Sequence, residues 1–413
     1  MVLCAAGIAA ASAPPAALAA VEAYDATAEA GFVDARGEGG RNYAKSHTWS
    51  ANVADFDGDT FEDVLVSTHY QGESWLMHNE PASGGGRHFQ EVFAGTFADV
   101  DRHDCAWADV NQDDRLDAYC TLGAERGIGV GPNELWIQQD DGSFRDQARA
   151  FGVTDRYGRG RHATFMDLNG DPYPDLYVGN TYPRNDGRPS HNKLFVSKSG
   201  ESFRRVDHTE PDRALGGESV QAVDYDRDGR EDLLVCGNNG LRLFRNLGGN
   251  DFRDVSSETG ARGTCQSALL VGLDGDQRPD LVRVADGGMV VKLQSGGEFR
   301  DPVFARSLQF GREVAAGDVD DDGDPDLYIL RGGPSHSDAP DQPDLMLETR
   351  KEGREYRRID IPQTTEGRGD SVSTIDYDAN GLSDFLVLNG HSDTRGPLRL
   401  VAFRCTTVPD PCI

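Results

Sequence analysis

The chain has 413 residues and carries 70 acidic against 41 basic side chains, which gives a formal net charge of −29 at pH 7. This acidity excludes nucleic acid and anionic membrane surfaces as partners, because both carry negative charge themselves. Hydrophobic residues make up 37% of the sequence, and 18 Phe, 12 Tyr and 4 Trp supply enough apolar area for a folded core.

The first 20 residues form an Ala-rich apolar run that ends in small residues. Such a run is typical of a secretory signal peptide, although no basic residue precedes it. We therefore expect a signal peptide over residues 1–22 and a secreted, extracellular protein. No other segment reaches the ~18 consecutive apolar residues of a membrane-spanning helix, so we expect no membrane span.

Six cysteines follow Cys4, and an even number in an exported chain indicates disulfide bonds. One pair flanks an acidic loop almost symmetrically, as partners across a hairpin do. The alternative is that all six are inert buried thiols. The expected pairs are Cys105 with Cys120, Cys236 with Cys265, and Cys405 with Cys412.

A nine-residue acidic motif recurs seven times, with oxygen-bearing side chains at its first, third, fifth and ninth positions. Successive copies start 46 to 58 residues apart. The fifth copy is degenerate, because a glycine occupies its first position. In chain order, the residues at these positions are Asp55, Asp57, Asp59 and Asp63; Asp109, Asn111, Asp113 and Asp117; Asp167, Asn169, Asp171 and Asp175; Asp224, Asp226, Asp228 and Asp232; Gly272, Asp274, Asp276 and Asp280; Asp318, Asp320, Asp322 and Asp326; and Asp376, Asp378, Asn380 and Asp384.

Short apolar runs surround every copy of this motif. Small and apolar residues precede it, and an apolar run such as Val64–Val66 or Leu327–Ile329 follows it, which is the pattern of a hairpin. Most copies continue with a third run, a Gly/Asp turn and a fourth run. Four short strands per ~56 residues, repeated seven times, predict an all-β, seven-bladed β-propeller with four-stranded antiparallel blades. We expect this propeller to span residues 23–413.

The seventh repeat reaches only a third strand, near residues 398–403. A segment from Tyr24 to Phe32 precedes the first copy of the motif, in the place of a fourth strand. We therefore expect an N-terminal strand to complete the last blade. Such closure of the ring protects sheet edges that an open array would expose.

Alternating oxygen ligands on a tight loop converge on one hard cation, and Ca²⁺ takes 6–8 oxygens at about 2.3–2.6 Å. Carboxylates this close together repel one another unless a cation neutralises them. We therefore predict about six or seven Ca²⁺ ions, one per blade loop, with a structural role. The predicted ligands are the residues given above for every copy except the fifth. For any single loop, the alternative is an Asp/Gly turn without metal.

This motif and the strand after it resemble the FG-GAP/VCBS repeat family of seven-bladed propellers, which is related in fold to the integrin α-subunit head. The segments His103–Asp109 and Asp175–Asn180 resemble the cartilage acidic protein-like branch, without the C-terminal modules of its larger members. The resemblance implies a secreted, acidic protein with calcium in these loops. It implies no single function, because the fold hosts adhesion proteins, lectins and polysaccharide lyases.

The residues before each motif and after each second strand are predicted to gather opposite the acidic loops, around the mouth of the central channel. Histidine and arginine are frequent there, so the mouth would suit an anionic or polyhydroxylated ligand. The alternative is that loop tips are simply polar. Seven of the ten histidines fall in these segments, namely His47, His69, His103, His162, His191, His336 and His391. The predicted ligand-binding residues are His47, Arg102, Glu218, Arg312 and Asp370.

Three functions remain open at this point. The first is a secreted, monomeric module that binds a glycan, small-molecule or protein ligand at the mouth. The second is an enzyme at the same mouth, such as a polysaccharide or uronate lyase or another elimination or cyclisation catalyst. Its base, cation and acid would come from His103, His162, Arg161 and Tyr182. The third is a purely structural surface protein.

Overall fold

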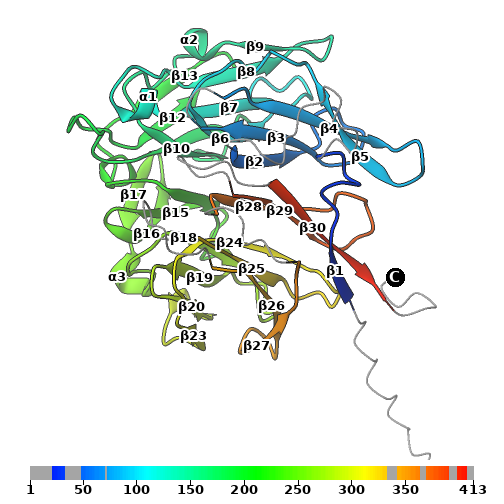
Figure 1. Ribbon diagram of the computed structural model, residues 1–413. Coiled ribbons are helices and arrows are strands. Elements are labelled where there is room, and N and C mark those ends of the chain that lie inside the picture. Colours follow the sequence, from blue (N-terminus) through cyan, green and yellow to red (C-terminus); the bar gives the residue numbers. More distant parts are fainter. Residues whose placement is uncertain are drawn as a thin grey trace, which may run out of the picture.

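The computed structural model describes residues 21–32, 48–69, 72–332, 342–362, 369–389 and 398–406. It contains seven four-stranded antiparallel sheets and one two-stranded sheet. Figure 1 shows the seven larger sheets arranged one after another around a ring. The prediction of an all-β, seven-bladed propeller is confirmed. No helix among the described residues is long and apolar enough to cross a membrane.

The first four blades follow the chain strictly in order. Blade one contains β2 (Thr48–Ala54), β3 (Asp63–Thr68), β4 (Trp75–Pro81) and β5 (Arg87–Val92). Blade two contains β6 (Arg102–Ala108), β7 (Asp117–Leu122), β8 (Glu134–Gln138) and β9 (Phe144–Asp146). Blade three contains β10 (Gly160–Met166), β11 (Asp175–Asn180), β12 (Lys193–Ser197) and β13 (Phe203–Val206). Blade four contains β14 (Ser219–Val223), β15 (Asp232–Gly237), β16 (Gly240–Gly248) and β17 (Asp251–Asp254).

The last three blades include the two irregular ones. Blade five contains β18 (Ser267–Val271), β19 (Asp280–Ala285), β20 (Gly288–Lys292) and β23 (Phe304–Arg306), with the small hairpin β21 (Gln294–Ser295) and β22 (Glu298–Phe299) inserted. Blade six contains β24 (Gly311–Gly317), β25 (Asp326–Arg331), β26 (Leu345–Arg350) and β27 (Glu355–Ile359). Blade seven contains β28 (Ser371–Ile375), β29 (Asp384–Leu388), β30 (Leu398–Cys405) and β1 (Val21–Asp25). Short helical turns lie between strands at α1 (Ala124–Gly127), α2 (Ala148–Phe151), η2 (Pro211–Arg213) and α3 (Ser256–Thr259).

The N-terminal strand closes the ring, as the sequence predicts. β1 pairs antiparallel with β30, in a register that runs from Val21 opposite Cys405 to Asp25 opposite Val401. Figure 1 shows the blue β1 beside the red β30. The strand begins two residues before the expected start of the propeller at residue 23. The expected signal peptide falls mostly on residues outside those described, so it stays a prediction.

The hydrophobic core lies between neighbouring blades. Every residue of β3, β7 and β11 is buried, because each second strand is covered on both faces by the adjacent sheets. Between blades six and seven, the ring of Tyr328 lies 5.0 Å from that of Phe385, centroid to centroid. Burial on both faces explains why these strands are continuous apolar runs in the sequence rather than alternating ones.

The first strands of neighbouring blades meet around the central channel, and polar side chains join them. Asn52 of β2 accepts a hydrogen bond from the backbone N–H of Cys105 in β6, at 3.0 Å. Glu313 of β24 accepts one from the backbone N–H of Val372 in β28, also at 3.0 Å. The channel wall is therefore polar and holds one blade against the next.

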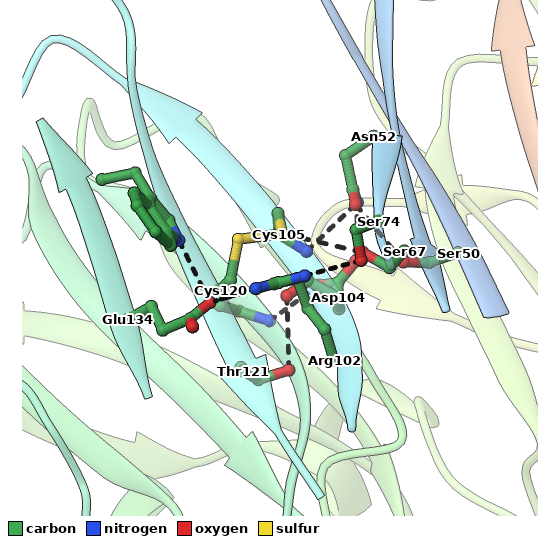
Figure 2. Close-up of a disulfide and its surroundings, with 12 residues drawn as sticks. Ser50, Asn52, Ser67, Ser74, Arg102, Asp104, Cys105, Cys120, Thr121 and Glu134 are labelled. Carbon is green, nitrogen blue, oxygen red and sulfur yellow. Dashed lines mark hydrogen bonds and ion pairs between the residues drawn. A yellow bond between two sulfur atoms is a disulfide. The ribbon is translucent and has the colours of Figure 1, made fainter. Parts of the chain in front are cut away.

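Two of the three predicted disulfides are confirmed. Cys105 and Cys120 lie directly opposite each other in β6 and β7, as partners across the acidic hairpin of blade two (Figure 2). Cys236 and Cys265 join the end of β15 to the segment before β18, so this bond links blade four to blade five. The third pair includes Cys412, which lies outside the described residues.

Candidate functional site

Each acidic loop joins the first and second strands of a blade, and its ninth residue begins the second strand. This aspartate is buried in all seven copies. In blade six, one oxygen of Asp326 accepts the backbone N–H of Val319 at 3.2 Å, and the other accepts that of Thr349 at 2.7 Å. The same two bonds recur in every copy, including the degenerate fifth. The ninth position therefore ties the loop to the third strand, or in blade five to β21 directly after it, a role that sequence reasoning missed.

The first residue of the motif shapes the loop. In the seventh copy, Asp376 accepts the backbone N–H groups of Asn380 and Gly381 at 3.1 and 3.0 Å. Gly381 has φ +86°, a left-handed conformation that favours glycine. The second copy has Asp114 at the same place with φ +65°, so its turn forms without glycine.

The acidic loops concentrate negative charge in partly buried places. Burial raises the pKa of Asp326 and of Asp384 to about 8, and repulsion from neighbouring carboxylates acts in the same direction. It raises the pKa of Asp320, the third residue of the sixth copy, to about 6. Asp320 is 5% exposed, and its buried Oδ1 atom has no hydrogen-bond partner among the described residues. An unpaired, buried carboxylate oxygen among other carboxylates fits a bound cation.

Ligand atoms of the first, third and ninth residues lie close enough to share one ion. Within copies one, four and six, these carboxylate oxygens all lie within 4.8 Å of one another. Oxygens that bind one Ca²⁺ at about 2.3–2.6 Å are at most ~5 Å apart. The residues present therefore fit calcium, which they would hold through carboxylate oxygens of the predicted positions.

Some acidic loops already contain a cationic side chain. Arg245 Nε lies 2.7 Å from Asp226 in the fourth copy, and Arg115 Nη2 lies 2.6 Å from Asp113 in the second. His78 Nε2 lies 3.0 Å from Asp57 in the first. Within the described ranges, the motif carboxylates of the third, sixth and seventh copies make no ion pair. These three loops are therefore the least neutralised by the protein itself.

At the opposite face, one structural position recurs around the channel. In each blade it is the residue six places before the acidic motif, which is either the second residue of the first strand or the residue just before that strand. In blades one, two, three and six the strand register shifts there. Such a β-bulge leaves a residue unpaired and re-aims its side chain. The seven equivalent residues are Trp49, His103, Arg161, Glu218, Gln266, Arg312 and Asp370, which we call the mouth ring.

Three side chains at the mouth form a buried cluster. His69 Nδ1 lies 2.8 Å from Asp101 Oδ1, His103 Nε2 lies 3.1 Å from the same oxygen, and the two nitrogens are 3.0 Å apart. The Trp49 ring stacks on His103, with centroids 4.6 Å apart. His103 is fully buried, Asp101 is 6% exposed and His69 is 8% exposed.

The surroundings of this cluster lower the pKa values of both Asp101 and His103. Burial opposes ionisation of Asp101, but hydrogen bonds from His103 and His69 outweigh it and hold its pKa well below the usual range. Burial, together with the nearby Arg161 guanidinium, lowers the pKa of His103 to about 3. Arg161 Nε in turn lies 3.3 Å from Glu218 Oε2 in the next blade. His103 is therefore neutral at physiological pH.

The structure brings together only some of the residues predicted at the mouth. Glu218, Arg161 and His103 adjoin one another, and Arg312 and Asp370 belong to the same ring. His162 lies 3.4 Å from Asp104 in the channel wall. His47, His336 and His391 lie outside the described residues.

Two predicted residues have other surroundings. Arg102 is fully buried between blades, where its guanidinium lies 2.7 Å from Glu134 and donates to Ser74 Oγ at 2.6 Å (Figure 2). The Tyr182 ring contacts that of His191, 5.1 Å away, within blade three. Arg102 therefore joins two blades instead of reaching the mouth.

Sequence reasoning also missed Asp101, the partner of His69 and His103. The only signal was the acidic residue two places before His103 in the sequence. A further feature without a sequence signal is an open cleft of about 780 Å³ between blades four and five. Its lining includes Glu218 and Gln266 of the mouth ring, with Asn238, Asn239 and Arg262.

Comparison with known proteins supports the repeat assignment. Residues 167–235, 224–282 and 272–329 match the FG-GAP-like repeat family, which covers the third to sixth copies of the acidic motif. The chain is also 30% identical over 169 residues to Cartilage acidic protein 1 of Xenopus tropicalis. That match covers 37% of this chain and 25% of the relative, so the chain spans about a quarter of the length of the curated relative that it matches.

One solved structure has a similar fold over most of its length. It is an Agrocybe aegerita lectin that recognises non-reducing terminal N-acetylglucosamine. The TM-score is 0.50 at 15% identity, and the similarity covers 87% of this chain and 89% of the lectin. At this identity the similarity shows the fold alone.

Proposed function

We propose that this chain, which is a seven-bladed propeller of FG-GAP-like repeats, is a secreted, calcium-stabilised protein that binds a ligand at the channel mouth. The ligand class that fits best is an anionic or polyhydroxylated molecule, such as a glycan, a small acid or an acidic segment of a protein. Two disulfides and the apolar N-terminal run support secretion.

The buried Oδ1 of Asp320 is the observation that carries the calcium proposal. A carboxylate oxygen without a hydrogen bond is costly in a buried place, and the surrounding like charges increase that cost. When bound, Ca²⁺ would neutralise the loop and fix the hairpin between the first two strands. The carboxylates of the sixth copy would hold it, and the ninth residue would at the same time keep its bonds to the backbone.

The cleft between blades four and five carries the ligand-binding proposal. Its volume of about 780 Å³ lies within the 300–1,000 Å³ typical of ligand pockets. Arg262 is exposed in its wall and makes no ion pair with any described residue, so its guanidinium is available to a carboxylate. Asn238 and Asn239 supply amide groups for hydroxyls. The similarly folded lectin supports binding of a sugar in general terms.

An array of neutral and acidic oligosaccharides, probed with the calcium-saturated protein, tests this proposal. We expect binding by the wild-type chain that is lost in Arg262→Ala and retained in Arg300→Ala, a control at an arginine outside the cleft. Absence of binding, or binding that survives Arg262→Ala, would count against the cleft. Because calcium binding is measured separately, its outcome does not depend on this one.

An enzyme at the mouth is the alternative, and the contact between Arg161 and His103 favours it. Elimination from a uronate needs a cation for the carboxylate and a base for the proton. The low pKa of His103 makes it a weak base, so the base proposed for this reaction is His162, which is half-buried in the channel wall. Absorbance of unsaturated uronate, recorded on the same acidic oligosaccharides, tests this alternative.

A further inference from the structure

We propose that His69, Asp101 and His103 hold a transition-metal ion of the Zn²⁺ type at the channel mouth. This inference goes beyond the proposed function, because the site is separate from the calcium loops and from the cleft. It rests on the arrangement of three ligand atoms, their burial and the groups behind them.

The three ligand atoms form a closed triangle with sides of 2.8, 3.0 and 3.1 Å. Each imidazole nitrogen in the triangle carries at most one proton, which points in the plane of its ring. If both nitrogens donate to Asp101 Oδ1, the two N–H groups confront each other across the 3.0 Å side. At least one of the two nitrogens must therefore present a lone pair to the triangle, and an ion at the centre would bind through the lone pairs of all three atoms.

The distances are close to those of a metal site. Zinc binds His nitrogen at 2.0–2.1 Å and carboxylate oxygen at about 2.0–2.2 Å in a tetrahedron, which places ligand atoms ~3.3 Å apart. The observed sides therefore need to widen by only a few tenths of an ångström. Three protein ligands leave a fourth position for water or for a donor atom of a ligand.

The groups behind the ligands orient them. The other ring nitrogen of His103, Nδ1, lies 2.9 Å from the backbone carbonyl of Gly160. A proton on Nδ1, donated to this carbonyl, leaves the Nε2 lone pair for the ion. Arg161 donates to the same Gly160 carbonyl at 2.9 Å, which helps to hold this carbonyl behind the imidazole of His103.

Close packing keeps the cluster in place. The Trp49 ring stacks on His103 with centroids 4.6 Å apart and lies tilted against His69, with centroids 4.5 Å apart. A Cβ atom at Gly123 would lie 2.3 Å from Asp101 Oδ2 and 2.8 Å from His103 Nε2. The backbone of Gly123 can approach the cluster only because it has no side chain, and its N–H donates to the carbonyl of Asp101 at 2.8 Å.

The donor set separates this site from the acidic loops. Imidazole suits Zn²⁺, Cu²⁺, Ni²⁺ and Co²⁺, whereas Ca²⁺ is held by oxygen. A divalent ion, Asp101, Arg161 and Glu218 together leave a net charge of +1, which suits an anionic donor in the fourth position.

Titration with Co²⁺ in the presence of excess Ca²⁺ tests the site, because calcium fills the oxygen-ligated loops. We expect the wild-type protein to bind one Co²⁺ with the intense visible absorption of a four-coordinate, nitrogen-containing site. His69→Ala and Asp101→Asn should weaken this binding at least about a hundredfold, since loss of an outer partner alone costs 10–100-fold. His208→Ala, at an exposed histidine away from the cluster, should bind as the wild type does.

Circular dichroism and the melting temperature of each variant show whether it folds. If both variants fail to fold, X-ray absorption of the Co²⁺-loaded wild type decides: two imidazole ligands support the site, and oxygen ligands alone overturn it. A wild-type protein that shows no four-coordinate spectrum in excess calcium would also overturn it. So would folded His69→Ala that binds Co²⁺ as tightly as the wild type.

Discussion

The carboxylate of Asp280 accepts the backbone N–H groups of Leu273 and Gln294 at 2.9 and 2.7 Å. It does so in the fifth acidic loop, where the first ligand position is a glycine and whose residues are not among the predicted calcium ligands. The ninth residue of the motif therefore has two separable roles. It fastens the loop to the third strand in six blades and to β21, directly after the third strand, in blade five, and it is a candidate calcium ligand in most of them.

Asp280→Ala should destabilise the protein equally with and without calcium. It removes two hydrogen bonds from a charged acceptor and leaves two buried backbone N–H groups unpaired, at a cost of about 3 kcal/mol. Urea denaturation in calcium and in EDTA measures this free energy of unfolding. A loss confined to the calcium condition would show that the fifth loop binds metal after all.

Asp320→Asn should have opposite effects in the two conditions. Without calcium, it should stabilise the fold by about 1 kcal/mol at pH 7, because it removes a charge whose pKa is raised by burial and by like charges, with allowance for solvent screening. With calcium, it should reduce the gain in melting temperature. Thermal melts in EDTA and in calcium measure both effects, and Asp301→Asn, at an exposed aspartate outside the motif, is the control. A variant less stable than the wild type in EDTA would contradict a repulsive loop.

Glu313 should make stability depend on pH. Burial raises its pKa from 4.5 to about 8, with Asp104 and Asp370 as neighbouring negative charges and hydrogen bonds from Val372 and Ser371 opposing the shift. Folding therefore favours the protonated form. The stabilisation is complete below pH 4.5 and is lost as the pH rises through about 8, by about 2 kcal/mol for this partly accessible side chain.

Glu313→Gln should remove this part of the pH dependence and should stabilise the protein at pH 8. Chemical denaturation at several pH values in saturating calcium measures the difference between variant and wild type. An identical slope for the two proteins between pH 5 and pH 8 would show that Glu313 titrates normally.

Arg102→Ala should lower the free energy of unfolding without changing ligand affinity. The variant leaves the carboxylate of Glu134 largely buried without its partner, and breaking a buried pair costs about 3–5 kcal/mol. The double variant Arg102→Met with Glu134→Leu should recover part of this loss. Urea denaturation and the oligosaccharide array measure the two properties. If the Arg102→Ala protein has normal stability but no longer binds oligosaccharides, Arg102 belongs to the ligand site after all.

The fold was predictable because its signals repeat. A loop such as Asp318–Asp326, followed by an apolar strand, occurs seven times at nearly constant spacing, and each copy indicates one blade. The closing role of β1 followed from the incomplete last repeat. The disulfide between Cys105 and Cys120 followed from their symmetric placement around one hairpin.

The mouth was less predictable, because side-chain direction there depends on β-bulges and on contacts between blades. Arg102 and His103 are neighbours in sequence, yet the bulge sends Arg102 between two blades and His103 into the mouth cluster. The partner of His103 is His69, which comes from the preceding blade and is 34 residues away. No local pattern in the sequence reports such a contact.

The central claim is that calcium in the acidic loops stabilises this propeller, and the most direct measurement combines elemental analysis with thermal melting. The purified chain should contain about six Ca²⁺ ions, and EDTA should remove them and lower the melting temperature. Calcium added back should restore it, whereas the same excess of Mg²⁺ should do so only weakly. A chain that contains no calcium and melts at the same temperature in EDTA would contradict the account.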